Sequence, residues 1–252
     1  MSSSSYLCLD PKTQSAFLRS IVERCAHRPD EPTPVAVFDL DGTLMDNRPR
    51  TCVILNEFAE QIRSREPDIA AKLASVKMND LAYLLSESLD RLGIARTDLA
   101  GELTVYWRNR FFADEHLKYD VALAGAVSFV RACYEAGAVI VYFTGRDLPL
   151  MGIGTFRSLR DLGFPIGVPG TEVVLKPDAN MPDEAFKRLD APKLTRVGRV
   201  IAAFDNEPGN CNILKTIFPE SATALVDTQH LPGAPPLLEG IPTLRDFHDE
   251  LS

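Results

Sequence analysis

Short apolar runs recur along most of the chain and are separated by Gly, Pro and polar residues. Runs of this length with such boundaries are typical of buried β-strands. Strands are therefore predicted at residues 35–40, 138–143, 171–175, 200–204 and 223–226.

Segments with helical periodicity lie between or before these strands. Helices are predicted at residues 11–27, 124–136, 148–162 and 210–218. Short apolar strands that alternate with amphipathic helices indicate βαβ units. We therefore expect an α/β protein built on a parallel sheet.

The alternation stops between residues 47 and 118, where only helical periodicity is found. Helices are predicted at residues 52–62, 80–92 and 98–112. The chain is therefore expected to contain an all-helical module, residues 47–118, inserted after the first strand. Residues 1–46 and 119–252 would form the α/β core.

Composition narrows the functional classes. The chain has 252 residues, 45% of them hydrophobic, and a net charge of −8, which is typical of a globular protein without a broad basic surface. Nucleic acid and anionic membranes are disfavoured as partners. No apolar run approaches the ~20 residues of a membrane span, and the N-terminus lacks the features of a secretory signal. A cytoplasmic protein is expected, and a small anionic substrate stays possible because a local cation can override the overall charge.

The strongest chemical signal is the string VFDLDGTLMD at residues 37–46. Asp39 and Asp41 are two residues apart, so in an extended segment both side chains point to one side. They lie where a strand ends at Gly42, the place where open α/β sheets bind ligands. Neighbouring carboxylates repel each other unless a cation lies between them, and such a pair suits Mg²⁺. The alternative is that the acids only stabilise the turn.

The whole string resembles the DxDGT signature of the haloacid dehalogenase superfamily. Three further motifs of that superfamily have candidates here in the same order. The second is a Thr or Ser at the end of a strand, and VYFTGRD at residues 141–147 matches it. The resemblance implies that Thr144 and Gly145 bind phosphate.

The third motif is a lysine with two candidates. Lys176 follows an apolar strand in a Lys-Pro dipeptide, as in many members, and Lys187 lies in the sequence EAFK. The 18 residues between Lys187 and Asp205 match one helix and a turn, which favours Lys187. Both stay candidates for phosphate binding.

The fourth motif is an acid after the next strand, and AAFDNE at residues 202–207 supplies Asp205. The superfamily often has a second Asp nearby, whereas this chain has Asn206 and Glu207. The resemblance implies that Asp205 reaches the metal. Whether Asn206, Glu207 or Asn210 makes a second contact, directly or through water, is open.

The resemblance also implies a fold and a mechanism. The fold would be a Rossmann-like parallel sheet covered by the helical module as a cap of the first type. Mg²⁺ would be bound by Asp39, the backbone carbonyl of Asp41, and Asp205. Asp39 would become an aspartyl phosphate, and Asp41 would act as general acid and then base.

Three arginines near these motifs are candidates for substrate binding. Arg48 and Arg50 begin the helical module, and Arg146 follows Thr144 and Gly145. The alternatives are exposed linker positions for Arg48 and Arg50 and pairing with Asp147 for Arg146.

The function predicted from these motifs is a Mg²⁺-dependent phosphatase acting on a small phosphorylated molecule. A phosphomutase would share the same motifs and cap type. A non-catalytic module that binds phosphate or a partner is the third reading, because the fourth motif is altered. The sequence leaves the oligomeric state open.

Overall fold

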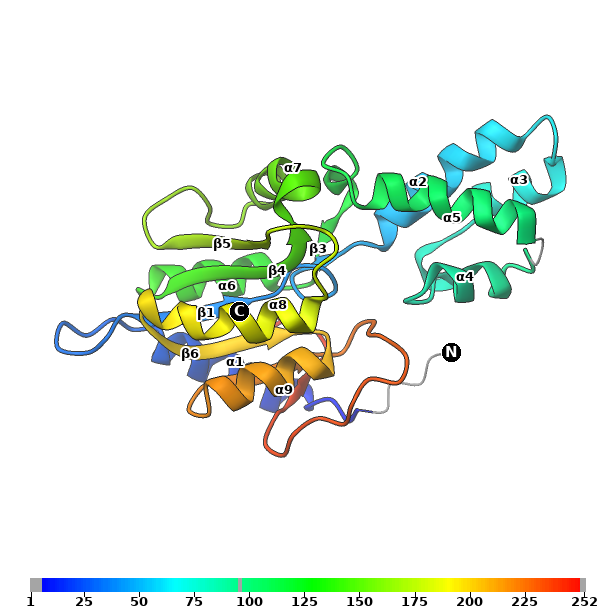
Figure 1. The fold of residues 1–252 in the computed structure, drawn as a ribbon. Helices are drawn as coiled ribbons and strands as arrows, with labels where there is room; N and C mark the ends of the chain where they lie inside the picture. The colour runs from blue at the N-terminus through cyan, green and yellow to red at the C-terminus, as the bar shows by residue number, and fades with distance from the viewer. Residues whose placement is uncertain (1–5, 95–96, 250–252) are drawn as a thin grey trace.

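A six-stranded parallel sheet forms the core of the computed structural model, which describes residues 6–94 and 97–249 (Figure 1). The strand order is β5-β4-β1-β6-β7-β8, so the first strand lies in the middle of the sheet. The predicted α/β class with a parallel sheet is confirmed. The strands are β1 (Pro34–Phe38), β4 (Val139–Asp147), β5 (Thr171–Lys176), β6 (Arg199–Asp205), β7 (Ala222–Val226) and β8 (Thr243–Leu244).

Helices cover both faces of the sheet. In Figure 1, α8 and α9 lie in front of the strands, and α1 and α6 lie behind them. Within the described residues, no helix is long and apolar enough to cross a membrane. The core helices are α1 (Pro11–Arg24), α6 (Ala126–Glu135), α7 (Leu148–Leu162), α8 (Asp183–Asp190) and α9 (Pro208–Ile217), with a 3₁₀ segment η3 (Ala191–Arg196) after α8.

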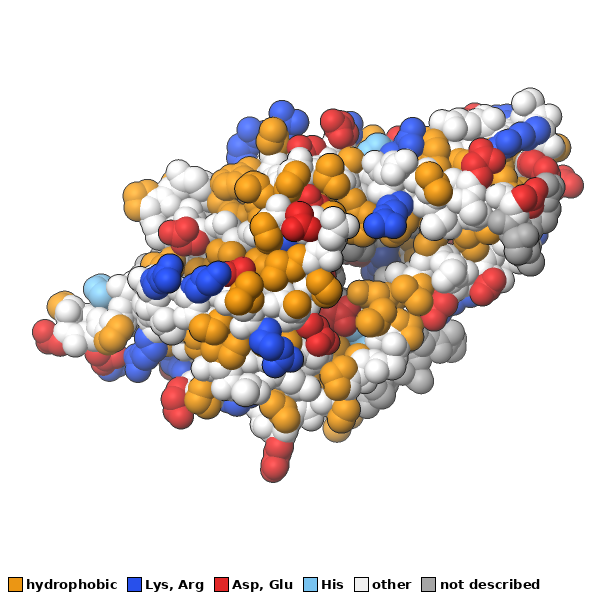
Figure 2. Space-filling view, viewed as in Figure 1, with side chains coloured by type: hydrophobic (Ala, Val, Ile, Leu, Met, Phe, Trp, Pro, Cys, Tyr) orange, Lys and Arg blue, Asp and Glu red, His pale blue; other side chains and the backbone are white. Residues whose placement is uncertain are grey.

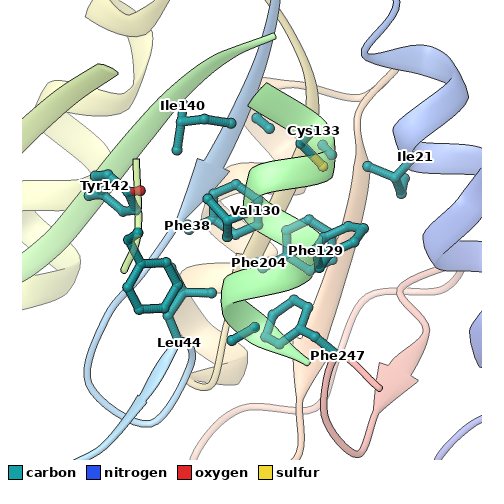
Figure 3. Packing of buried hydrophobic residues seen from close by; sticks show 14 of the residues in the cluster. Ile21, Phe38, Leu44, Phe129, Val130, Cys133, Ile140, Tyr142, Phe204 and Phe247 are labelled. Atoms are coloured by element: carbon teal, nitrogen blue, oxygen red, sulfur yellow. The ribbon is translucent and has the colours of Figure 1, made fainter. Parts of the chain in front are cut away.

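Strand β1 is buried along its whole length. Alternate side chains of a strand point to opposite faces, and here Val35 and Val37 join the cluster under α8 and α9, while Phe38 joins the cluster under α1 and α6. Figure 3 shows the second cluster, where the Phe38 ring stacks on Phe204 at a centroid distance of 5.1 Å and meets Phe129 edge-on. Burial on both faces explains why this strand is a continuous apolar run.

Residues 48–111 form a group of helices beside the core, which we call the helical insert (Figure 1). Its apolar side chains form a cluster of their own, centred on residues such as Phe58, Leu73, Leu89 and Leu103. The insert contains α2 (Arg48–Ile62), α3 (Pro67–Ala74), the 3₁₀ segment η1 (Met78–Asp80), α4 (Leu85–Arg91) and α5 (Thr97–Phe111).

The insert differs from its prediction in two ways. Helix α3 was not predicted. The helix expected at residues 80–92 begins only at Leu85, because the preceding residues turn toward the core. The Leu81 carbonyl accepts a hydrogen bond from Gln229 Nε2 (2.9 Å), and the Ala82 amide donates to Ser88 Oγ (2.9 Å). The tertiary contact with Gln229 and the local bond to Ser88 together override the helical periodicity.

The chain leaves the core for the insert and returns through two short adjacent strands. β2 (Met45–Asp46) pairs antiparallel with β3 (Val121–Ala122), with the 3₁₀ segment η2 (Leu117–Tyr119) just before β3. The two connections between the core and the insert are therefore held side by side.

Replacing Phe38 with Ala should lower the free energy of unfolding by about 3–5 kcal/mol, because it removes a fully buried ring and leaves a cavity. Chemical denaturation measures the change. Leu7→Ala is the control: Leu7 is 96% exposed, so its replacement should cost under about 0.5 kcal/mol. Equal losses in both variants would contradict the packing described for β1.

Candidate active site

The carboxyl ends of three neighbouring strands meet at one edge of the sheet. Phe38 is paired with Tyr142 of β4 and with Phe204 of β6. Asp39 follows β1, and its amide donates to the Phe204 carbonyl (2.9 Å). Asp205 is the last residue of β6. The parallel pairing therefore brings together acids that are far apart in the sequence.

Lys187 forms ion pairs with both of these acids. It is 1% exposed and projects from α8, and its ammonium group donates to Asp39 Oδ1 (2.8 Å) and to Asp205 Oδ2. An ammonium between two carboxylates offsets part of their mutual repulsion. Of the two candidate lysines, Lys187 is the one that contacts the acidic pair.

Lys176 lies outside this group. Its ammonium group donates to Asp183 Oδ1 (2.6 Å) and to the Met181 carbonyl (3.1 Å). These contacts hold the loop between β5 and α8. The structure therefore places Lys176 in a loop contact, away from the acids that a phosphate-binding lysine would adjoin.

Thr144 and Gly145 lie where strand β4 departs from regular pairing. The register with β5 is interrupted between Phe143 and Asp147. Thr144 is 1% exposed, and a Cβ at Gly145 would lie only 2.4 Å from Asp183 Oδ2. The small residue lets this segment pass close to Asp183 at the cavity wall.

The turn after Asp41 requires glycine. Gly42 has φ of +78°, and a Cβ there would lie 2.5 Å from Asn206 Nδ2. The Thr43 hydroxyl lies 3.3 Å from Asp39 Oδ2 and from Asn206 Oδ1, while Asn206 Nδ2 donates to the Gln229 carbonyl. Asn206 therefore holds the turn that carries the two acids.

Asn210 and Glu207 both donate hydrogen bonds to Asp205, one from its side chain and the other from its backbone. Asp205 Oδ1 accepts hydrogen bonds from the Glu207 amide (2.9 Å) and from Asn210 Nδ2 (3.2 Å). Asn210 Oδ1 is buried and has no hydrogen-bond partner. The Glu207 carboxylate instead accepts from Tyr83 of the insert and from the Leu231 amide. Burial raises the pKa of Glu207 to about 7.

Asp39 lies in an environment where negative charge exceeds positive charge. Burial raises the pKa of Asp39 to about 7; the ammonium of Lys187 opposes the rise, and the carboxylate of Asp205 adds to it. One ammonium group therefore does not fully compensate two buried carboxylates. A further cation next to Asp39 would favour its ionised form.

Asp41 belongs to a buried network of four charges. Arg146 Nε donates to Asp41 Oδ2 (2.7 Å) and Arg50 Nη2 to Asp41 Oδ1 (2.8 Å). Both arginines also bind Asp120, and both are buried. Burial acts to raise the pKa of Asp41, but the charges of Arg146 and Arg50 outweigh it and hold that pKa below its ordinary value.

Asp120 was not identified from the sequence, and Arg50 was predicted as a substrate contact or an exposed linker residue, whereas the structure buries it against Asp41 and Asp120. Arg50 comes from the first turn of α2, and Asp120 immediately precedes β3. A signal was present, because Arg50 falls on the apolar face of α2 with Ile54 and Phe58, spaced four residues apart. A charged residue on such a face needs a buried partner.

The three arginines predicted as substrate contacts, Arg48, Arg50 and Arg146, are all bound by carboxylates. Asp46 binds the guanidinium of Arg48 with both oxygens, at 2.7–3.1 Å. Arg146 is bound by Asp41 and Asp120.

A cavity of about 380 Å³ lies between the core and the helical insert. Figure 2 shows the surface hollowed where the two meet. The core contributes Asp39, Asp41, Thr144, Gly145 and Asp205, and the insert contributes Leu81–Leu85, Trp107, Phe111 and Phe112.

The acidic residues here suit a divalent cation that prefers oxygen ligands. Among the described residues, no group of three or more His, Cys, Asp or Glu side chains forms a ready-made metal site. Mg²⁺ commonly uses only one or two carboxylates together with water and substrate oxygens. Asp39, Asp205 and the unpartnered Asn210 Oδ1 are consistent with that kind of site.

Comparisons with known proteins identify the fold. No protein-family model and no curated protein sequence matches the chain. A candidate phosphatase from Clostridium difficile is similar in structure, with a TM-score of 0.52, 14% identity, and coverage of 77% of this chain and 84% of that one. At this identity the similarity shows a shared fold.

Two other solved structures are similar over a larger share of this chain but with lower TM-scores. A family IA, variant 3 hydrolase of the haloacid dehalogenase type from Entamoeba histolytica has 15% identity and a TM-score of 0.47, covering 85% of this chain and 94% of that one. A dehalogenase has 12% identity and a TM-score of 0.48, covering 84% and 93%.

Asp120→Ala should lower the free energy of unfolding by about 3–5 kcal/mol, because it leaves two buried guanidinium groups with Asp41 as their remaining carboxylate. Thermal or chemical denaturation measures the loss. Asp161→Ala is the matched control: Asp161 pairs with Arg160 on the surface, and such pairs contribute about 0–1 kcal/mol. A loss for Asp120→Ala no larger than the control would show that the network does not stabilise the fold.

Proposed function

We propose that this chain is a member of the haloacid dehalogenase superfamily and a Mg²⁺-dependent phosphomonoester hydrolase. The observation that carries the proposal is the grouping of Asp39, Lys187 and Asp205 at the strand ends beside a cavity. A nucleophilic carboxylate, a buried ammonium and a second carboxylate are the groups that phosphoryl transfer through an aspartate needs.

Asp39 and Asp205, with the backbone carbonyl of Asp41, would hold the metal. When bound, Mg²⁺ supplies positive charge to the phosphoryl oxygens and to the two carboxylates. The raised pKa of Asp39 in a site with one ammonium and two carboxylates supports the need for such charge.

Asp39 is the proposed nucleophile. One of its oxygens attacks phosphorus, the bond from phosphorus to the ester oxygen breaks, and the electron pair stays on the departing oxygen. Lys187 and the Thr144 hydroxyl would donate hydrogen bonds to the phosphoryl oxygens, where negative charge is spread in the transition state. Water then attacks the aspartyl phosphate and restores Asp39 with release of phosphate.

Asp41 is the proposed general acid and base. Its ionised form, which the neighbouring arginines favour, would take a proton from the water that attacks the aspartyl phosphate. The protonated Asp41 would give this proton to the departing ester oxygen of the next substrate molecule, so that the alcohol leaves uncharged.

Asp39→Asn should reduce phosphate release from an aryl phosphate in Mg²⁺ to background, because an amide oxygen is a poor nucleophile. Lys187→Met should lower kcat/KM by about 10²–10³-fold through loss of charge stabilisation. Lys12→Met is the control, because Lys12 is exposed on α1, and it should leave kcat/KM unchanged. Circular dichroism of each variant checks the fold. Full activity of Asp39→Asn would rule out this mechanism.

Mg²⁺ should raise the melting temperature of the wild-type protein, because a ligand that binds only the folded state stabilises it, by about 2.7 kcal/mol at 100 times its Kd. Asp205→Asn should abolish the rise, and Asp161→Asn, at the surface, should retain it. Differential scanning calorimetry measures the melting temperature in Mg²⁺ and, as the control, in KCl at equal ionic strength. The difference between the two isolates the effect of Mg²⁺. An unchanged rise in Asp205→Asn would place the metal elsewhere.

A further inference from the structure

The cavity has two chemically different ends. The strand ends provide the carboxylates together with Thr144 and Gly145. The insert and α7 provide apolar side chains. With phosphate held at the strand ends, the rest of a substrate would extend toward the apolar end. That end is lined by Leu81, Leu84, Leu85, Trp107, Phe111, Phe112 and Met151.

Three aromatic rings, two at the carboxyl end of α5 and one on the residue that follows it, form much of this apolar wall. Trp107 and Phe111 stack at a centroid distance of 4.4 Å, and Phe112 meets both edge-on, at 6.0 and 5.0 Å. Trp107 Nε1 donates to Thr51 Oγ1, so its polar atom already has a partner. Phe112 is still 39% exposed and offers an apolar surface to a bound molecule.

The charges that line the cavity are mostly negative. Besides Asp39, Asp41 and Asp205, the described lining includes Asp46, Asp183 and Glu207. The lysines and arginines within that described lining are Arg48 and Arg146, and both are already bound by carboxylates. A second anionic group on a substrate would therefore meet carboxylates without a free cation to receive it.

We propose that the substrate is a phosphomonoester with an apolar, ring-sized leaving group that carries no second negative charge; this inference rests on the proposed function. The cavity of about 380 Å³ lies at the small end of ligand sites, which span about 300–1,000 Å³. Burial of an apolar ring against Trp107, Phe111 and Phe112 supplies the binding energy. The same lining disfavours a phosphomutase, because its bisphosphate primer carries a second phosphate.

The first experiment compares kcat/KM in Mg²⁺ for benzyl phosphate, glucose 6-phosphate, phosphocholine and fructose 1,6-bisphosphate. All four release an alkyl alcohol, so differences in intrinsic leaving-group reactivity are small beside those in an aryl ester. The kcat/KM for benzyl phosphate should be at least about tenfold above that for each of the other substrates. A ratio of this size corresponds to the binding free energy of one aromatic contact and its buried area.

The second experiment tests the aromatic wall. Phe112→Ala should lower kcat/KM for benzyl phosphate by about tenfold and leave that for glucose 6-phosphate unchanged. Val105→Ala is the matched control, because Val105 is 61% exposed on α5 and does not line the cavity. It should change neither value. Melting temperatures verify that all variants fold.

The outcomes separate the two proposals. If glucose 6-phosphate, phosphocholine or the bisphosphate is the better substrate, the leaving-group class is wrong and the phosphatase activity stands. If Phe112→Ala lowers both kcat/KM values equally, the ring does not select the leaving group and the inference is overturned. If the folded wild-type protein with Mg²⁺ hydrolyses none of the four, and no aryl phosphate either, the proposed function itself fails.

Discussion

The candidate site depends on the parallel pairing of β1 between β4 and β6. This pairing fixes Asp39, Thr144 and Asp205 at one edge of the sheet, although more than a hundred residues separate the first two. Parallel strands need long crossovers, and here one crossover contains the entire helical insert. The connection from β1 to β4, which the parallel sheet requires, therefore also supplies the apolar wall of the cavity.

Buried charges are the second constraint on this architecture. Lys187 lies between two acids, and Arg50 and Arg146 each bind two carboxylates. Burying such groups is costly unless each has a partner of opposite sign and good geometry. The network around Asp120 satisfies this at the base of the insert, whereas the acids beside Lys187 retain an excess of negative charge. That excess is located where the proposed Mg²⁺ would bind.

Local patterns in the sequence were sufficient to predict the sheet and the acids at its edge. Apolar runs predicted the central strands, and the predicted α/β class with a parallel sheet is confirmed. The DxDGT string indicated the acids that follow the first strand. The network of Arg50 and Asp120 could not be predicted, because its partners lie 70 residues apart and no local period links them. The choice between Lys176 and Lys187 likewise required the packing of α8 against the sheet.

The paired strands β2 and β3 have a consequence for how this protein can vary. Met45 lies opposite Ala122, so the chain leaves the core and returns to it at adjacent points. This holds for an insert of any length. The entropy of closing a loop grows only with the logarithm of its length. Replacing the helices between these strands would thus leave the sheet and its acids in register. Under the proposed function, the insert would set the choice of substrate and the sheet edge would carry the bond-breaking chemistry. Arg50, which binds Asp41, would couple the two.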